Sequence, residues 1–224
     1  MKVEIRKSSK RRTISLKIEQ GQVVVLAPER TSERKIESIL KEHQSWITKQ
    51  LLKWETQAAD LKTKVFEPGG EFLYLGQVYR LNVVAGVSGK VLIEGQSIAL
   101  QTHTVSEPVI KLRLFQWYVS QARLILPAKT IETAQKLGKQ PKKIEMGQFK
   151  SLWGSCSRDG RIKYNWQLMQ APEPVIDYIV AHEVSHLCHM DHSAEFWATV
   201  ESLQPDYKTH RKWLKDNAYR LSWP

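Results

Sequence analysis

The chain has 224 residues, of which 42% are hydrophobic and 25% are charged, and these proportions exclude a disordered or fibrous protein. Lys and Arg outnumber Asp and Glu by 34 to 23, and the formal net charge of +11 favours association with polyanions such as nucleic acid or nucleotides. Two cysteines are too few for a disulfide framework, and no apolar stretch reaches the roughly 20 residues of a membrane helix. No secretion signal is recognisable, so the sequence predicts a cytoplasmic protein without membrane association.

Residues 1–104 predict a β-rich N-terminal module with one helical insert. Alternating apolar and polar residues between 2 and 30 predict a β-hairpin. An amphipathic helix is expected from a cap at Thr31 or Ser32 to about Gln57. The rest of the module is predicted as a linker over 62–70 and short strands between 71 and 102.

Residues 105–224 predict a second domain in which helices outnumber strands, so the whole chain is expected to be an α+β protein. Pro127 is expected to divide or kink the first helix of this domain, and the Asp159-Gly160 pair indicates a hairpin. The expected elements are a helix over 108–137, strands over 144–153 and 161–166, a helix that begins at Pro172, and two short helices over 194–203 and 206–218.

The strongest chemical signal is the motif His-Glu-Val-Ser-His over residues 182–186, inside the helix that begins at Pro172. Residues four apart project from the same face of a helix, so His182 and His186 can bind one metal ion while Glu183 lies beside the open coordination position. This pattern is typical of zinc hydrolases, in which the glutamate deprotonates a zinc-bound water. We therefore expect Zn²⁺ as the cofactor and Glu183 as the general base.

A catalytic zinc ion usually has three protein ligands, and the candidates for the third are His189, His192, Glu195 and Glu201. His189 lies on the same helical face as His182, but about 10 Å of helical rise separates the two. His192 can reach the metal if the chain turns back after the helix, and Asp191 or Ser193 can cap the helix that follows. The spacing therefore predicts His192, and the two glutamates remain the alternative.

Several further motifs resemble those of the YgjP-like metallopeptidase family. They are Arg11–Leu16, Trp153–Ser157, Ile176–Val180, the motif at 182–186, His192-Ser193 with Phe196-Trp197, and Pro205–Lys208. The resemblance implies a zincin-like catalytic domain in the C-terminal half, with zinc held by His182, His186 and His192 and with Glu183 as the catalytic residue. The site is also similar to that of SprT-like proteases that act on DNA-bound proteins, in which a His followed four residues later by Phe supplies the third ligand, as His192 and Phe196 would here.

The substrate contacts are less sharply indicated. In a zincin-like domain, an extended strand edge beside the metal can pair with an extended substrate, and the small residues Gly154 and Ser155 would allow a close backbone approach. A packed strand end explains the same segment equally well. A second group is expected to stabilise the developing negative charge, and Asn165, Tyr207 and Arg211 remain open for that role. The candidate substrate-binding residues are Trp153, Gly154, Ser155, Asn165 and Tyr207.

The favoured function is a zinc-dependent metallopeptidase that acts on a peptide or protein substrate. The family resemblance raises a second function, pyrophosphatase activity on nucleoside triphosphates with UTP as the first candidate, although no glycine-rich phosphate loop is evident. A third alternative is a nucleic-acid-associated protein that uses the basic run Arg6–Arg12. That alternative leaves the zinc motif without a role.

Overall fold

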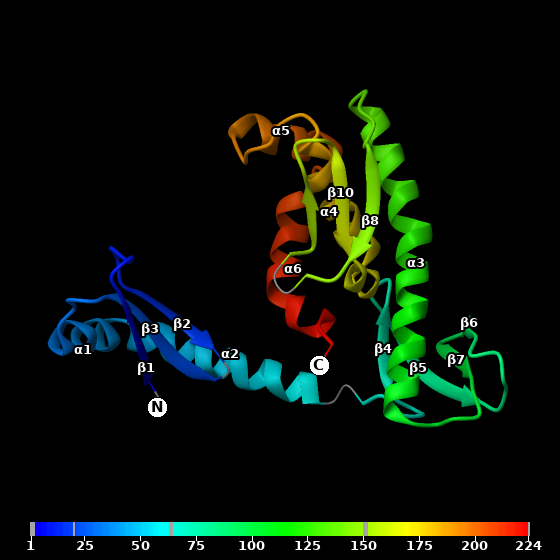
Figure 1. Cartoon of the computed structure of the whole chain (residues 1–224), viewed down its shortest axis with the longest axis horizontal. Helices are drawn as coiled ribbons and strands as arrows, with labels where there is room; N and C mark the ends of the chain where they lie inside the picture. Colours follow the sequence, from blue (N-terminus) through cyan, green and yellow to red (C-terminus); the bar gives the residue numbers. More distant parts are fainter. Residues whose placement is uncertain (1–2, 20, 63–64, 150–151, 224) are drawn as a thin grey trace. The chain divides into compact units, whose positions relative to one another are not determined.

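The computed structural model describes residues 3–19, 21–62, 65–149 and 152–223, without the side chains of 57–62. The chain forms two compact units, Met1–Thr63 (unit 1) and Lys64–Pro224 (unit 2). In Figure 1, unit 1 runs from blue to cyan and unit 2 from cyan to red. The two units are described separately below.

The boundary between the units differs in position from the boundary predicted between residues 104 and 105. It falls between 63 and 64, and these two residues of the predicted linker lie outside the described part of the chain. The strands between 71 and 101 share one hydrophobic core with the helix that follows them, so they belong to unit 2. The assignment of 105–224 as the catalytic domain stays a prediction.

A three-stranded sheet begins unit 1. β2 (Ser15–Glu19) and β3 (Gln22–Pro28) pair antiparallel, which confirms the predicted hairpin. β1 (Val3–Ser8) pairs in parallel with the other edge of β3, so β3 is the central strand. Residues 23–25 of this strand are buried.

Two helices complete unit 1. α1 (Glu33–Glu42) is capped by Ser32, one of the two predicted caps, whose hydroxyl accepts a backbone hydrogen bond. α2 (Gln44–Lys62) follows after a break at His43. The prediction of one uninterrupted helix is therefore wrong, because His43 leaves the helical conformation with φ −99° and ψ 14°.

A four-stranded sheet opens unit 2 and confirms the predicted second set of strands. Its order is β4-β5-β7-β6, and β5 and β7 are parallel while the outer pairs are antiparallel. Phe72, Leu81 and Ile98 are buried in the core of the unit. The strands are β4 (Glu71–Tyr74), β5 (Gln77–Val84), β6 (Val91–Glu94) and β7 (Ser97–Gln101).

The long helix α3 (Glu107–Lys136) runs through Pro127 without interruption. A division into two helices, one of the two outcomes predicted for this proline, is therefore wrong. Proline removes one backbone hydrogen bond from a helix. Leu126 and Thr130 on either side of it are fully buried, and their packing offsets that loss.

A second three-stranded sheet follows α3, with the order β8-β10-β9. β8 (Lys143–Gly147) is parallel to β10 (Arg161–Asn165), and β9 (Gly154–Cys156) pairs antiparallel with β10 at the edge. The predicted strand over 144–153 is wrong beyond residue 147, because the chain leaves the sheet there. The predicted turn is confirmed: it joins β9 to β10, and Gly160 supplies the positive φ of +79° that the turn requires.

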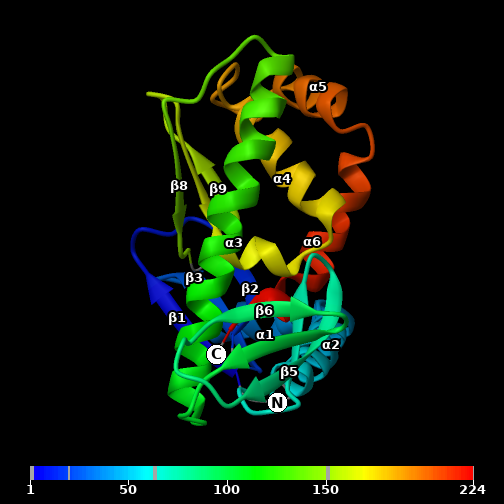
Figure 2. The same ribbon diagram turned by 90° about the vertical axis from the view of Figure 1, so that its right-hand side faces the viewer.

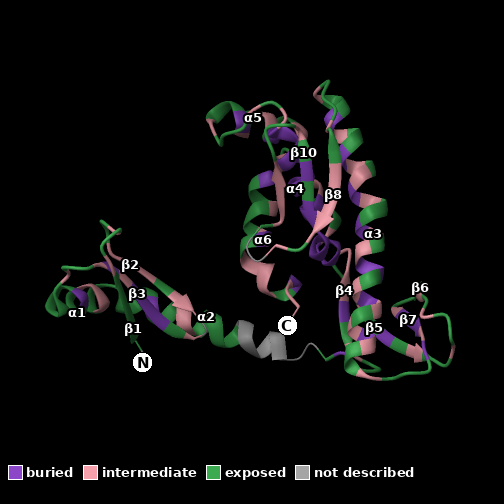
Figure 3. Cartoon of the chain, in the orientation of Figure 1, coloured by how far each residue is buried: buried purple, intermediate pink, exposed green. Residues whose placement is uncertain are grey.

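From Trp166 onward the chain is helical and positions the candidate site, and the three α-helices of this part were predicted. Its elements are the 3₁₀ helix η1 (Trp166–Gln170), α4 (Glu173–Ser185), α5 (Ala194–Leu203) and α6 (Tyr207–Leu221). All of η1 is buried (Figure 3), and α4 packs against α3 (Figure 2), where Lys129 lies 2.7 Å from Asp177. These elements confirm the α+β class. Among the described residues, no helix has the length and apolar composition needed to cross a membrane.

Candidate metal centre

Helix α4 carries the first two histidines of the motif near its C-terminal end. The helix begins after Pro172, whose fixed φ of −56° suits a helix start, and it ends at Ser185 with His186 as the C-cap. The N–H groups of Cys188 and His189 both donate to the Ser185 carbonyl at 3.0 Å, which tightens the last turn. The helix therefore ends directly after the motif, as the assignment of His192 requires.

A short turn then brings the chain back toward α4. The Asp191 carboxylate accepts a hydrogen bond from the backbone N–H of Ser193 at 3.0 Å. The Ser193 hydroxyl in turn accepts from the N–H of Phe196 at 3.4 Å and caps α5, as predicted. The first of these bonds spans His192, and the second begins α5 directly after it.

The three predicted ligands come together. The ring nitrogens of His182, His186 and His192 that can bind a metal all lie within 4.8 Å of one another. The Nε2 atoms of His182 and His192 are 3.3 Å apart. His186 Nδ1 lies 2.9 Å from the His189 carbonyl, so this nitrogen must donate, and Nε2 keeps a lone pair for a metal.

Burial keeps two of the three histidines, His182 and His186, neutral. Burial, together with the neighbouring rings of His186 and His192 and the cation Arg211, lowers the pKa of His182 to about 3. Burial likewise lowers the pKa of His186. The buried Nδ1 of His182 has no hydrogen-bond partner among the described residues. Neutral imidazoles are the form that binds a metal, and such a nitrogen set suits zinc and its neighbours in the transition series, so these residues fit a metal ion.

Glu183 lies next to the three histidines in an apolar setting. It is 4% exposed, and burial raises the pKa of its carboxyl to about 8. A cation at the histidines would lower that pKa and favour the carboxylate. A buried carboxyl with a pKa near neutrality is typical of a catalytic acid or base.

In the metal-free protein, Glu183 should produce a loss of stability at alkaline pH. Its pKa is about 8 in the folded state against an ordinary 4.5, so the unfolded chain releases this proton first and stability falls as pH rises. Between pH 6.5 and about pH 8, the contribution of Glu183 to this fall should be on the order of 1.5 kcal/mol. Histidines such as His182, half protonated at pH 6.5 in the unfolded chain, contribute with the opposite sign, and this contribution is the same in a Glu183→Gln variant. Urea unfolding at a series of pH values measures it. Glu183→Gln should abolish the fall, and an equal fall in the variant would contradict the assignment.

Strand β9 lies directly against Glu183 through Gly154. A Cβ atom placed on Gly154 would lie 2.6 Å from Glu183 Oε1, 2.7 Å from Cγ and 2.8 Å from Cδ. Real Cβ atoms do not approach other atoms this closely, so the carboxyl can occupy its position only because residue 154 has no side chain. The sequence predicted a close approach at Gly154, but to a substrate backbone, and this contact with Glu183 was not foreseen.

Gly154→Ala should therefore displace the Glu183 carboxyl. We expect a loss of hydrolytic activity of about tenfold or more with the metal content unchanged, because a shift of about 1 Å in a group of an active site has effects of this size or larger. We also expect a loss of about 1–3 kcal/mol in the free energy of unfolding from overpacking. Activity assays and urea unfolding measure the two effects.

The Glu183→Ala background provides the control for Gly154→Ala. In that background the clashing atoms are absent, so adding Gly154→Ala should leave the free energy of unfolding nearly unchanged. An equal destabilisation in both backgrounds would show that the new methyl group clashes elsewhere.

An aromatic cluster forms one wall of the site. Phe196 is fully buried, and its ring centroid lies 5.0, 4.5 and 4.8 Å from those of His182, His186 and His192. Trp197 lies 5.7 Å from the His182 ring and 5.9 Å from the His192 ring. In the sequence, Phe196 and Trp197 stood out only through the family resemblance.

The other candidate substrate-binding residues differ in their burial and in the contacts that they make. Ser155 pairs with Lys163 in the β9–β10 ladder, and the Trp153 carbonyl accepts from the Asn165 N–H at 2.9 Å. Asn165 is 2% exposed, and its side-chain amide donates to two backbone carbonyls at 3.3 Å. Tyr207 is buried and its ring stacks on Trp197, with centroids 5.3 Å apart. A role of these residues in substrate binding stays a prediction.

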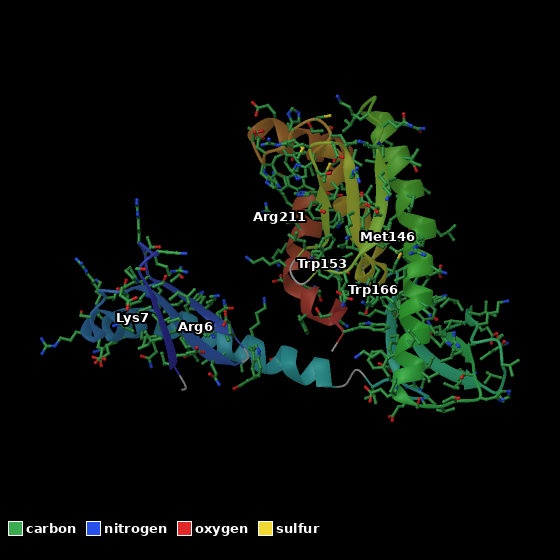
Figure 4. The ribbon with its side chains drawn as sticks, in the orientation of Figure 1. Arg6, Lys7, Met146, Trp153, Trp166 and Arg211 are labelled. Atoms are coloured by element: carbon green, nitrogen blue, oxygen red, sulfur yellow. The ribbon has the colours of Figure 1, made fainter. Side chains whose placement is uncertain are left out.

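The basic run of unit 1 is partly neutralised. Arg6, labelled in Figure 4, makes ion pairs with Glu4 at 2.7 Å and with Glu19 at 2.8 Å. The Lys7 amine donates to the Thr31 carbonyl at 2.9 Å. The two carboxylates offset the charge of Arg6, whereas the carbonyl occupies one donor of Lys7 and leaves its charge. Nucleic-acid association stays a prediction.

Comparisons with known proteins place these observations in a family. Residues 12–217 match the family model described as YgjP-like, metallopeptidase domain. Among solved structures, the chain is similar to the crystal structure of the metallopeptidase zymogen abylysin from Pyrococcus abyssi. The identity is 22% and the TM-score 0.37, over 41% of this chain and 93% of that one. No curated protein matches the chain.

Proposed function

The chain belongs to the YgjP-like metallopeptidase domain family, and from that membership and the geometry of the site we propose that it is a zinc-dependent peptidase. In this proposal His182, His186 and His192 hold the zinc ion, and Glu183 is the general base. The observation that carries the proposal is the convergence of three imidazoles within 4.8 Å of one another beside a buried carboxyl.

The proposed ligands include one that the motif alone does not supply. The turn after α4 places His192 with its Nε2 atom 3.3 Å from that of His182, so no glutamate of α5 is needed to complete the set. Three neutral imidazoles suit zinc, with a fourth position left for substrate or water. The bond from His186 to the His189 carbonyl orients the second ligand.

In the proposed reaction, the metal ion and the residues of the chain have separate roles. Zinc, when bound, would polarise the scissile carbonyl and an attacking water molecule. The Glu183 carboxylate takes the proton of the attacking water and passes it to the leaving amine. Its burial keeps bulk water away from the carboxyl and strengthens its interaction with nearby charge. Gly154 keeps this carboxyl in place by leaving room for it.

An extended peptide is the substrate that the surroundings of the site favour. β9 is an edge strand of its sheet and lies against Glu183 through Gly154, so its outer edge is available to pair with a substrate backbone. Trp153 and Ser155 flank this contact. We expect the protein to act on peptides or unfolded proteins in the cytoplasm.

Metal reconstitution tests the proposal. The protein is stripped with a chelator, reloaded with one equivalent of zinc or magnesium, and incubated with an unfolded protein whose fragments are followed by mass spectrometry. We expect no cleavage by the stripped protein and full recovery with zinc. Cleavage that persists without metal, or that only magnesium restores, would contradict the proposal.

A further inference from the structure

Arg211 on α6 carries a positive charge that no carboxylate of the described residues neutralises. Two neighbouring cations of the helix are paired: Lys208 lies 3.5 Å from Glu201, and Lys212 lies 3.3 Å from Asp216. Arg211 is exposed, and no ion pair or hydrogen bond to it is found within the described ranges. The charge of Arg211 is therefore available to a ligand.

Trp197 holds this charge close to the three histidines. The guanidinium carbon of Arg211, a residue labelled in Figure 4, lies 4.8 Å from the centroid of the Trp197 ring. The same ring lies 5.7 Å from His182 and 5.9 Å from His192. One aromatic ring thus contacts both the cation and two of the proposed ligands.

The way Arg211 is held leaves its hydrogen-bonding capacity unused. A guanidinium that stacks on an aromatic face interacts through its plane, so the five N–H groups at its edge remain free. These donors form a planar fork that matches a carboxylate or phosphate. The ring restrains the side chain before a ligand arrives, which reduces the entropy lost on binding.

We propose that Arg211 is a substrate-binding residue that holds an anionic group of the substrate beside the three-histidine site. The inference rests on the proposed function, because it takes that site as the place of reaction. For a peptide the anion is the C-terminal carboxylate, and for a nucleotide it is a phosphate. With a peptide substrate, Arg211 would direct cleavage to bonds near the C-terminus.

Binding measurements test the inference without any turnover. Zinc-loaded protein carrying Glu183→Gln is titrated by calorimetry with three probes: an N-acetylated tripeptide with a free carboxylate, the same tripeptide as an amide, and inorganic phosphate. Adding Arg211→Gln should weaken the binding of at least one anionic probe by about tenfold or more. The affinity for the tripeptide amide should stay unchanged. The affinity of Arg211→Lys for that probe should lie between the affinities of the parent protein and of Arg211→Gln, because lysine keeps the charge but lacks the planar fork of donors.

Lys212→Gln is the matched control, because it removes the same charge from the next position of the same helix. It should leave the affinities for all three probes unchanged. Loss of carboxylate binding alone in Arg211→Gln would identify a peptide end as the ligand, and loss of phosphate binding alone would identify a nucleotide. Affinities that do not depend on Arg211, or that fall equally in Lys212→Gln, would overturn the inference, as would the absence of anion binding.

The binding experiment can overturn the inference without overturning the proposed function, and the reverse also holds. A protein that cleaves no peptide but shows Arg211-dependent anion binding would lose the proposed function and keep the inference. A zinc-dependent peptidase whose anion binding does not depend on Arg211 would keep the function and lose the inference.

Discussion

Glu183→Gln should lower the rate of peptide cleavage by about a thousandfold while the protein keeps its zinc. The amide has nearly the shape of the carboxyl, so the contact with Gly154 remains, but it cannot accept a proton from water. Loss of a general base typically costs about 10²- to 10⁴-fold in rate. Fragment yield by mass spectrometry and zinc content by elemental analysis measure the two quantities.

Glu195→Gln is the matched control for Glu183→Gln. Glu195 is an exposed residue in the first turn of α5 and was one of the alternative third ligands. The same chemical change there should alter neither rate nor zinc content. A large loss of zinc in Glu195→Gln would favour a glutamate ligand over His192, and unchanged cleavage in Glu183→Gln would remove Glu183 from the mechanism.

His192→Ala should lose most of the bound zinc, whereas His189→Ala should keep it. His192 brings its Nε2 atom to the cluster, but His189 contributes only a backbone carbonyl, which accepts from His186 and survives the substitution. Removing a residue that only orients a ligand can cost about 10- to 100-fold in metal affinity, so removing a ligand should cost more than about 100-fold. Competition with a chromogenic chelator measures the affinities of both variants.

Equal zinc loss in the two variants would contradict this ligand assignment. It would indicate that the turn after α4, which contains both residues, collapses when either side chain is shortened. Circular dichroism and the unfolding midpoint distinguish this outcome, because a collapsed turn would also lower stability in His189→Ala.

The convergence of the three histidines was predictable because it depends on local geometry. His182 and His186 share a helical face through the period of the helix, which needs no knowledge of the rest of the fold. His192 required one further step, the recognition that a polar segment with capping residues ends one helix and begins another. The structure brings these three side chains together as the spacing indicated.

Contacts between distant parts of the chain were not predictable in the same way. Gly154 and Glu183 meet because β9 lies beside α4, and no periodicity in the sequence encodes that packing. Arg211 was one of three open candidates for a charge-stabilising role, and only its position over Trp197 sets it apart from Asn165, whose amide already bonds to backbone carbonyls.

The errors in the predicted elements have local causes. An amphipathic pattern continues across His43, so the break between α1 and α2 leaves the apolar spacing almost intact. The apolar residues after Gly147 resemble a strand, but the chain leaves the sheet there, and β9 begins only at Gly154. In both cases the path of the backbone changes without a change in the pattern of apolar residues.

The most direct test of the central claim compares two substrates at one site. Zinc-loaded protein and its Glu183→Gln variant are incubated in parallel with an unfolded protein and with UTP, and peptide fragments and pyrophosphate are followed by mass spectrometry. We expect peptide fragments from the wild type alone and no pyrophosphate above the level of the variant. Pyrophosphate released from UTP by the wild type but not by the variant, without peptide fragments, would contradict the account and assign the site to phosphoanhydride hydrolysis.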